Sequence, residues 1–514
     1  MNDVADFMVR IGRNIASARE RRGMPQAELA KKIHTSQSAI NRIEHGKQNA
    51  SLEMISKISK ALGQQIVSIS SSSTQSYRIC GGKTLSGEVT INTSKNAAVG
   101  LLCASLLSKG TTTLHHLAHI EEVYRILEVF DSIGVKYSWI NKDHDLKITP
   151  PDKLDLDNLD VAAARRTRSV IMLMGPLLHH FKNFRLPYAG GCSLGSRTVY
   201  PHLRALQHFG LEVDSVSESG FYKAKVKSTN DTFKKIVLIE RGDTVTENAV
   251  MAAALNPGRT QIVGASPNYM VQDVCHYIET LGVEIHGIGT TNLEITGQAK
   301  IHKDIDFTPG EDPIEAMSFI AAAIATQSEL LIKRVPIDYL EIELEVLRSM
   351  GQKMELTPEY YSENGFTKLV DIRIIPSKLV APNDKIHPMP FPGLNIDSLP
   401  FFSLIAAQAE GRTMIHDWVF ENRAIYSTEL TNLNAKVELL DAHRIFITGP
   451  TNWRPAEMMA PPALRPSVVV MLAMLAAPGT SILRNTYSIA RGYEKFAERL
   501  CDLGAEIELL SDLN

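Results

Sequence analysis

Residues 101–113, LLCASLLSKGTTT, and residues 127–135, LEVFDSIGV, carry the pattern that decides the fold. A helix rich in leucine and alanine leads to a Gly-Thr turn and a short strand, and a second helix ends at Gly134 before an apolar strand. The ending of that second helix recurs at intervals of roughly 70 to 80 residues. Its copies lie at 127–135, 206–211, 278–283, 347–352, 430–435 and 500–505.

The helix and turn that open this unit also recur. Because the period exceeds that of most solenoid repeats, each copy is expected to be a small α/β subdomain. Six copies divide into two groups of three, which predicts two lobes, one over roughly residues 95–300 and one over 78–94 with 301–514. The copies of the opening segment lie at 101–113, 251–262, 320–332, 405–415 and 471–482.

The composition is that of an ordinary soluble protein with more than one domain. A chain of 514 residues exceeds what one hydrophobic core normally supports, and 44% of its residues are hydrophobic while 22% are charged. Its five cysteines are scattered without a CxxC pair, which argues against a disulfide framework or a cysteine zinc site and fits a reducing cytoplasm. The longest apolar run, 468–477, is too short to cross a bilayer, so no membrane partner is expected.

Charge divides the chain into a basic head and an acidic body. Residues 1–68 carry 11 Lys and Arg against 6 Asp and Glu, although the whole chain has a net charge of −3. A basic segment on an acidic protein indicates a second, anionic partner. The serine-rich run at 68–77 has almost no apolar residues and is expected to be a flexible linker between domains at 1–67 and 78–514.

The head has the helix spacing of a helix-turn-helix domain. A break at residues 23–25 separates a first helix from one at 26–33, and Thr35 or Ser36 can cap a third that runs to about residue 46. The segments QAELA at 26–30 and SQSAINRIEHG at 36–46 closely resemble the Cro/C1 (XRE-type) repressor family. The resemblance implies that the third helix enters the major groove of duplex DNA. It places near bases or phosphates Ser36, Gln37, Ser38, Asn41, Arg42 and Lys47.

Two interpretations of the head stay open. Helix-turn-helix modules normally read two half-sites as dimers, so a homodimer is implied if DNA is the partner. The alternative is a small helical bundle that serves only protein contacts, with a polar face that is merely solvated.

A glycine-hinged loop in the body carries one thiol and one guanidinium group. Residues 190–197 read GGCSLGSR, so Cys192 lies five residues before Arg197, between glycines that allow a close approach of the backbone to a ligand. An arginine binds phosphate or carboxylate and lowers the pKa of a nearby thiol. We therefore expect Cys192 to be reactive, although an inert buried cysteine would have the same local sequence.

Further short motifs are spread through residues 78–514. They are SKNAA at 94–98, TRS at 167–169 leading into MGPL at 174–177, FENR at 420–423 after Asp397, LR at 464–465 and RGYE at 491–494. Together with GGCSLGSR, these motifs resemble those of the UDP-N-acetylglucosamine 1-carboxyvinyltransferases within the enolpyruvyl transferase family. The resemblance implies an all-α helix-turn-helix head followed by the enolpyruvyl transferase fold, an α/β (α+β) fold of six βα repeats in two pseudo-threefold globules.

The implied reaction transfers the enolpyruvyl group of phosphoenolpyruvate to a sugar hydroxyl of UDP-N-acetylglucosamine or a related nucleotide sugar, with release of phosphate. It needs cations for a phosphate and a carboxylate, a proton for the methylene carbon and a base for the hydroxyl. No metal or cofactor is expected, because guanidinium groups neutralise the charge.

The resemblance also assigns roles to particular residues. Asp397 would be the base, and Cys192 would be the general acid or aid product release. Arg465 would bind the carboxylate, and Asn96 would contact the acceptor sugar. The remaining residues that the resemblance assigns to phosphate binding or to the substrate cleft are Lys95, Arg168, Arg197, Phe420 and Arg491.

Four positions depart from the family pattern. A uridine-binding Pro-Val-Asp after Arg197 is replaced by Thr-Val-Tyr ending at Tyr200, and a diphosphate-binding Ser-Val-Gly is replaced by Gly-Asp-Thr around Asp243. A carboxylate near a diphosphate would repel it. Ile396 replaces a threonine, and Ala463 replaces an aspartate. The phosphoenolpyruvate half of the site therefore looks retained, and the acceptor half looks altered.

Two alternatives follow from these departures. The same chemistry could act on a different nucleotide acceptor in secondary metabolism, or the body could be a catalytically silent ligand sensor of a transcription regulator. The retained Cys192 and Asp397 argue against the silent sensor, and Ala463 argues mildly for it.

Overall fold

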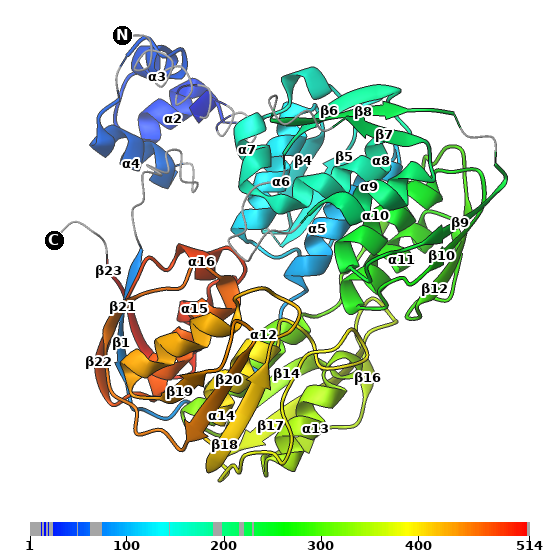
Figure 1. Cartoon of the computed structure of the whole chain (residues 1–514). Coiled ribbons are helices and arrows are strands. Elements are labelled where there is room, and N and C mark those ends of the chain that lie inside the picture. Colours follow the sequence, from blue (N-terminus) through cyan, green and yellow to red (C-terminus); the bar gives the residue numbers. More distant parts are fainter. Residues whose placement is uncertain are drawn as a thin grey trace. The chain divides into compact units, whose positions relative to one another are not determined.

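The computed structural model describes residues 24–48, 50–61, 75–142, 144–188, 198–214, 220–228 and 231–510, together with isolated positions between 12 and 19. Contacts divide the chain into two compact units, residues 1–74 with 512–514 and residues 75–511 (Figure 1). Each unit has a hydrophobic core of its own.

The described part of the head contains the two helices of a helix-turn-helix motif and a further helix. They are α2 (Gln26–Lys32), α3 (Gln37–Glu44) and α4 (Leu52–Ala61). Ser36 caps α3, because its hydroxyl accepts a hydrogen bond from the backbone N–H of Ala39 at 3.2 Å. The expected cap at this helix is therefore confirmed.

The described part of the body contains six sheets (Figure 1). In one of them β3 (Thr112–Leu114) pairs with β5 (Asp145–Thr149), which pairs with β4 (Lys136–Ile140), so the last strand of the unit lies in the middle. Helix α6 (Glu121–Ser132) connects β3 to β4. Gly134 has a φ of 86° after this helix, a left-handed conformation that glycine adopts without strain.

Four of the other five sheets repeat this strand order, and in the remaining sheet the middle position is taken by the strand that opens the body, so that six repeats are present as predicted. The strands of these five sheets are β6 (Asn183–Pro187), β8 (Phe221–Val226) and β7 (Leu211–Asp214); β10 (Gly258–Val263), β12 (Asn292–Gly297) and β11 (Glu284–His286); β14 (Leu330–Pro336), β17 (Lys368–Ile375) and β15 (Lys353–Leu356); β18 (Gly411–His416), β20 (Arg444–Gly449) and β19 (Lys436–Leu439); and β22 (Gly479–Arg484), β1 (Ser76–Gly81) and β23 (Glu506–Leu510).

Further short strands extend some of these sheets. They are β13 (Ile305–Phe307), β9 (Phe233–Val237), β2 (Glu88–Thr90) and β21 (Glu457–Met459), each parallel to its neighbour, and β16 (Tyr360–Tyr361), which pairs antiparallel with β17.

The fifth repeat differs from the others in its second helix. This segment, η5 (Ala424–Leu433), is a 3-10 helix, and Asn434 has the left-handed φ of 76° that glycine provides in the other repeats. Asparagine tolerates this conformation better than other non-glycine residues, so the turn is preserved.

Two hydrophobic cores lie inside the body, and we call the parts around them the first and second lobes. The first core uses residues from 97 to 307, and the second uses residues 79–91 with 314–505. In the second core α12 (Pro313–Ala325), α14 (Leu399–Ala406) and α15 (Leu464–Ala476) pack against one another, and every residue of α12 is buried. In the first core α5 (Lys95–Ala104) and α8 (Met174–Leu177) both contact α10 (Asp243–Ala254).

The remaining helices lie around these central ones. They are α7 (Val161–Arg166), α9 (Tyr200–Gln207), α11 (Tyr269–Thr280), α13 (Glu341–Ser349), α16 (Tyr487–Ala490) and α17 (Phe496–Asp502), with 3-10 turns η1 (Ser105–Leu107), η2 (Leu156–Asn158), η3 (Arg168–Leu173) and η4 (Ile337–Tyr339). Among the described residues, no helix combines the length and the apolar character that crossing a membrane requires.

Candidate active site

Two chain segments cross between the lobes and position the first residues of the site, at the start of α5. Residues 92–94 run beside residues 310–312, with the N–H of Ser94 donating to the carbonyl of Gly310 at 2.8 Å and the N–H of Asp312 donating to the carbonyl of Asn92 at 2.9 Å. Helices α5 and α12 both begin directly after this crossing. Lys95 and Asn96, at the start of α5, are therefore held next to the second lobe.

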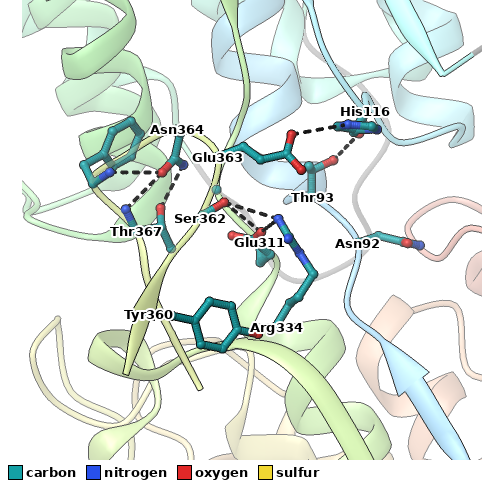
Figure 2. A network of polar contacts seen from close by, with 12 residues as sticks. Asn92, Thr93, His116, Glu311, Arg334, Tyr360, Ser362, Glu363, Asn364 and Thr367 are labelled. Atoms are coloured by element: carbon teal, nitrogen blue, oxygen red, sulfur yellow. Dashed lines mark hydrogen bonds and ion pairs between the residues drawn. The ribbon is translucent and has the colours of Figure 1, made fainter. Parts of the chain in front are cut away.

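A network of polar contacts surrounds the crossing (Figure 2). The carboxylate of Glu311 accepts a hydrogen bond from Ser362 at 2.8 Å and is paired with Arg334. His116 of the first lobe lies 3.6 Å from Glu363 of the second. The two segments that join the lobes are thus held by side chains from both.

Lys95 is paired with a buried carboxylate. Its Nζ lies 3.0 Å from Oε2 of Glu122, and the hydroxyl of Ser169 donates to the other oxygen at 2.9 Å. Burial alone would raise the pKa of Glu122, but the charge of Lys95, hydrogen bonds from Lys95 and Ser169, and the charge of Arg491 outweigh it and lower the pKa to about 2. Lys95 also lies beside Gly492, where an added Cβ would be 3.2 Å from its Cδ. The structure therefore brings Lys95 and Arg491 together.

Asp397 lies between two arginines of the second lobe. Its Oδ1 is 3.6 Å from Nη1 of Arg423, and its Oδ2 is 3.6 Å from Nη2 of Arg465. Both guanidinium groups are almost fully buried, whereas a third of the Asp397 side chain is exposed. Arg423 is fixed by Asp417 and by the carbonyl of Ile396, and it stacks over Phe420 at 4.2 Å. The carboxylate is thus oriented by its neighbours and open on one side.

The first lobe presents polar side chains toward Asp397. Nδ2 of Asn96 donates to the hydroxyl of Tyr269 at 2.9 Å. The charges of Asp397 and Arg465 both act on the pKa of Tyr269, and the charge of Asp397 also acts on the pKa of Asp243. Residues of both lobes therefore meet at one site.

The predicted nucleotide half of the site centres on the start of α10. The carboxylate of Asp243 accepts hydrogen bonds from Ser266 at 2.5 Å and from Asn268 at 3.3 Å. Burial raises the pKa of Asp243, and the charge of Asp397 adds to this rise, while the two hydrogen bonds oppose it. Tyr200, which opens α9, has 54% of its surface exposed.

A family comparison covers the whole region that carries these residues. Residues 79–500 match the family of EPSP synthase (3-phosphoshikimate 1-carboxyvinyltransferase). The chain belongs to this family. It is therefore an enolpyruvyl transferase, and its head, which matches a helix-turn-helix family over residues 15–67, is a helix-turn-helix domain.

Relatives and solved structures agree with this assignment. The transferase is 32% identical to UDP-N-acetylglucosamine 1-carboxyvinyltransferase of Campylobacter hominis, covering 85% of this chain and 99% of that protein. It is 33% identical to the protein of the same name from Wolinella succinogenes, covering 84% and 98%. Its fold is similar to that of the enolpyruvyl transferase NikO from Streptomyces tendae, with a TM-score of 0.73, 23% identity and coverage of 85% and 99%.

The structure describes several of the predicted site residues of this transferase, and the roles of all of them stay predictions. Lys95, Asn96, Asp397, Phe420, Arg465 and Arg491 lie around one site. Nη2 of Arg168 donates to the carbonyl of Thr198 at 3.5 Å. Cys192 and Arg197 lie outside the described residues, and their roles stay predictions.

Sequence reasoning missed three residues of the site. Glu122, Asp312 and Tyr269 contact predicted residues, but each stands in a helix start or cap where its type is common. Arg423 was part of the motif FENR and had no assigned role. Its position in a charged motif that follows Asp397 is the sequence signal that could have identified Arg423.

We expect Glu122→Gln to destabilise this transferase by about 2 kcal/mol at pH 7, because Lys95 would lose its charged partner in a mostly buried position. A carboxyl with a pKa near 2 in the folded protein stabilises it fully above its ordinary pKa of 4.5, and the contribution is lost as the pH falls toward 2. Urea unfolding of wild type and variant between pH 3.5 and 7.5 should show a difference that shrinks with acidity.

Glu121→Gln is the matched control for this measurement. Its carboxylate pairs with Arg125 at 2.7 Å and is 34% exposed, so its loss should cost less than about 0.5 kcal/mol. Equal effects of the two changes at all pH values would contradict a special role for Glu122.

Proposed function

We propose that the body transfers the enolpyruvyl group of phosphoenolpyruvate to a hydroxyl of UDP-N-acetylglucosamine or a related nucleotide sugar, in cytoplasmic cell-wall (peptidoglycan) precursor synthesis. The observation that carries the proposal is the partly exposed carboxylate of Asp397 between the buried guanidinium groups of Arg423 and Arg465. Such an arrangement supplies a base for a hydroxyl next to cations for an anionic substrate.

Each substrate group has a partner in this proposal. Lys95 and Arg491 bind the phosphate with Arg197, and Arg465 binds the carboxylate. Because Glu122 already pairs with Lys95, an arriving phosphate would share that ammonium group with it. Cys192 donates the proton to the methylene carbon or assists product release, as the sequence motif implies.

Phosphate release from phosphoenolpyruvate, measured across a panel of UDP-sugars and nucleotides, tests the proposal. We expect release with at least one nucleotide sugar. Phosphate release with a nucleotide, but with none of the UDP-sugars, would favour the alternative acceptor in secondary metabolism. No release with any member of the panel would favour a silent sensor and contradict the proposed activity.

We expect UDP-N-acetylglucosamine to bind this transferase more weakly than it binds its relatives. Asp243 stands where a diphosphate is expected, and Tyr200 replaces a residue that contacts the uracil ring. Losing one hydrogen bond to a buried base edge costs about 1 to 3 kcal/mol, or roughly ten-fold or more in affinity. Calorimetric titration should show tighter binding by Asp243→Val and Tyr200→Asp than by wild type.

Asp384→Val is a control for the charge change, because Asp384 is an exposed aspartate of the second lobe. It should leave the affinity unchanged. Micromolar binding by wild type, with no gain from either substitution in the nucleotide half, would show that this half of the site is misassigned.

We also propose that the head binds duplex DNA through α3 and the residues after it, as a homodimer. Support comes from the helix-turn-helix match and from the basic charge of residues 1–68. Arg42 lies on α3, where its Nε donates to the side chain of Gln48 at 2.9 Å. A phosphate contact can replace that exposed hydrogen bond at little cost.

The affinity of the full chain for a duplex covering its own promoter region should fall as salt rises. Lys47→Ala should reduce the slope of log affinity against log salt by about one, because one phosphate contact is lost. Lys436→Ala removes an exposed lysine of the body and should leave the slope unchanged. If the full chain shows no salt-dependent binding to this duplex, the result would favour a head that contacts only proteins.

The domain division is part of the same proposal. The predicted division was a head at 1–67, a linker at 68–77 and a body at 78–514, but Ser76 and Tyr77 pair with Leu510 and Leu483 in β1, so we end the linker at residue 74 and begin the body at Gln75. We extend the first lobe to residue 307, because Ile305 and Phe307 are buried in the first core.

A further inference from the structure

Asp397 lies on a short loop that is tied to a buried glutamate. The loop leads into α14, and the backbone N–H of its residue Asn395 donates a hydrogen bond to Oε1 of Glu343 at 2.8 Å. Glu343 belongs to α13, and only 1% of its surface is exposed. A carboxyl group that is almost excluded from solvent therefore binds the backbone two residues before the proposed base.

Asn395 links Glu343 to Asp397. Its Oδ1 accepts a hydrogen bond from the backbone N–H of Asp397 at 2.9 Å. Its carbonyl accepts further hydrogen bonds from the N–H groups of Ser398 at 3.0 Å and Leu399 at 3.2 Å, at the start of α14. The conformation of the loop around Asp397 therefore depends on where Asn395 is held.

The position of this loop matters for the direction of the Asp397 carboxylate. The ion pairs of Asp397 with Arg423 and Arg465 both measure 3.6 Å, which is longer than a hydrogen bond. At this distance the two guanidinium groups attract the carboxylate without the directional constraint of a short contact. The backbone of the loop must therefore contribute to the placement of the base, and Arg423 and Glu343 are the side chains from other elements that bind it.

A carboxyl group is costly at this place in α13. The other buried residues of the helix are Leu344 and Leu347, which belong to the second core. Burial raises the pKa of Glu343 to about 7, although the N–H of Asn395, its own N–H and the hydroxyl of Ser398 oppose the rise. A buried polar group needs partners to offset its desolvation. In the described part of the chain, the partners of Glu343 outside its own helix both belong to the loop.

We propose that Glu343 is a positioning residue for the transfer reaction, because its buried carboxyl group fixes Asn395 and thereby places the carboxylate of Asp397 for deprotonation of the acceptor hydroxyl. The inference rests on the proposed function and deepens it. Glu343 acts through the loop and touches no substrate, so its loss should affect turnover more than the binding of phosphoenolpyruvate.

Two substitutions in the full chain separate the hydrogen bond from the bulk of the side chain. Glu343→Met fills a similar volume and offers only a weak acceptor, whereas Glu343→Gln keeps an oxygen for the N–H of Asn395. Misplacement by about 1 Å can cost roughly 10²-fold in rate, so Glu343→Met should lower kcat by at least about ten-fold. Glu343→Gln should keep kcat within about two-fold of wild type, and neither variant should change the KM for phosphoenolpyruvate more than about two-fold.

Glu345→Met is the matched control on the same helix. Glu345 is 70% exposed and pairs with Arg348 at 3.3 Å, so its replacement should leave kcat unchanged. A wild-type kcat in Glu343→Met would overturn the inference. So would an equal fall of kcat in Glu343→Met and Glu343→Gln, because glutamine keeps the hydrogen bond.

Asn395→Ala tests the same link with Glu343 left in place. Alanine keeps the N–H that binds Glu343 and removes the Oδ1 that accepts from Asp397. This variant should also lower kcat by at least about ten-fold with little change in the KM for phosphoenolpyruvate. A wild-type kcat would overturn the inference, even if Glu343→Met failed to fold in urea unfolding experiments.

Hydrogen–deuterium exchange of the full chain separates this inference from the proposed function. Peptides that contain residues 394–399 should exchange faster in Glu343→Met than in wild type, because one amide has lost its acceptor, and Glu343→Gln should resemble wild type. If no acceptor supports phosphate release, the proposed reaction fails, whereas faster exchange in Glu343→Met alone still supports the tie between α13 and the loop. Unchanged exchange in Glu343→Met overturns the inference whether or not the protein turns over.

Discussion

Asp397→Asn is expected to lower kcat by about 10³-fold with any accepted substrate, since a positioned general base contributes roughly 10² to 10⁴ in rate. The amide has the shape of the carboxylate and can still lie between Arg423 and Arg465, but it cannot take a proton. Removal of one negative charge beside two guanidinium groups should leave phosphoenolpyruvate binding equal or tighter.

Two measurements decide this prediction. Phosphate release gives the rate, and equilibrium titration with phosphoenolpyruvate gives the binding. Asp441→Asn is the control, because Asp441 also pairs with an arginine, Arg444 at 2.6 Å, in an exposed position of the second lobe. Turnover at the wild-type rate by Asp397→Asn would remove this carboxylate from the mechanism.

Arg465→Lys should lower kcat/KM for phosphoenolpyruvate by about 100-fold, although the charge is kept. The guanidinium of Arg465 is 6% exposed, lies 5.1 Å from the ring centre of Tyr493, and has an Nε without a partner among the described residues. A planar fork binds a carboxylate through two parallel hydrogen bonds, which a lysine cannot reproduce. Loss of one charged hydrogen bond costs about 1.5 to 3 kcal/mol.

The control for this change is Arg484→Lys. Arg484 pairs with Glu457 at 2.6 Å on the surface, with 46% of its side chain exposed, and a lysine can replace it there at little cost. The KM for the acceptor should change much less than the KM for phosphoenolpyruvate in Arg465→Lys. A loss confined to the acceptor would place Arg465 in the other half of the site.

The repeats were predictable because each one marks its own helix end. A glycine between an apolar helix and an apolar strand is a local signal, and Gly134 shows how the left-handed turn requires it. The membership of β1 in the sixth sheet was not predictable, because Tyr77 pairs with Leu483 across the whole body. The 3-10 geometry of η5 was hidden for another reason, since its sequence has ordinary helical spacing.

The site was predictable only where its residues stand in motifs. Lys95 and Asn96 open a helix after a strand, and Asp397 and Arg465 each lie in or near a recognisable segment. Glu122 gives no such signal, because an acidic residue in the first turn of a helix is favoured by the helix dipole alone. Its partnership with Lys95 depends on the packing of α5 against α6.

The two lobes differ in when their hydrophobic cores can form during synthesis of the chain. The first core is continuous in the chain, from residue 97 to residue 307, so it can form while the rest is still being made. The second core includes Ile79, and β1 pairs on both sides with strands from the last repeat, β22 and β23. A nascent chain must therefore keep β1 unpaired until residues 479–510 emerge, and the head is complete long before the transferase that follows it.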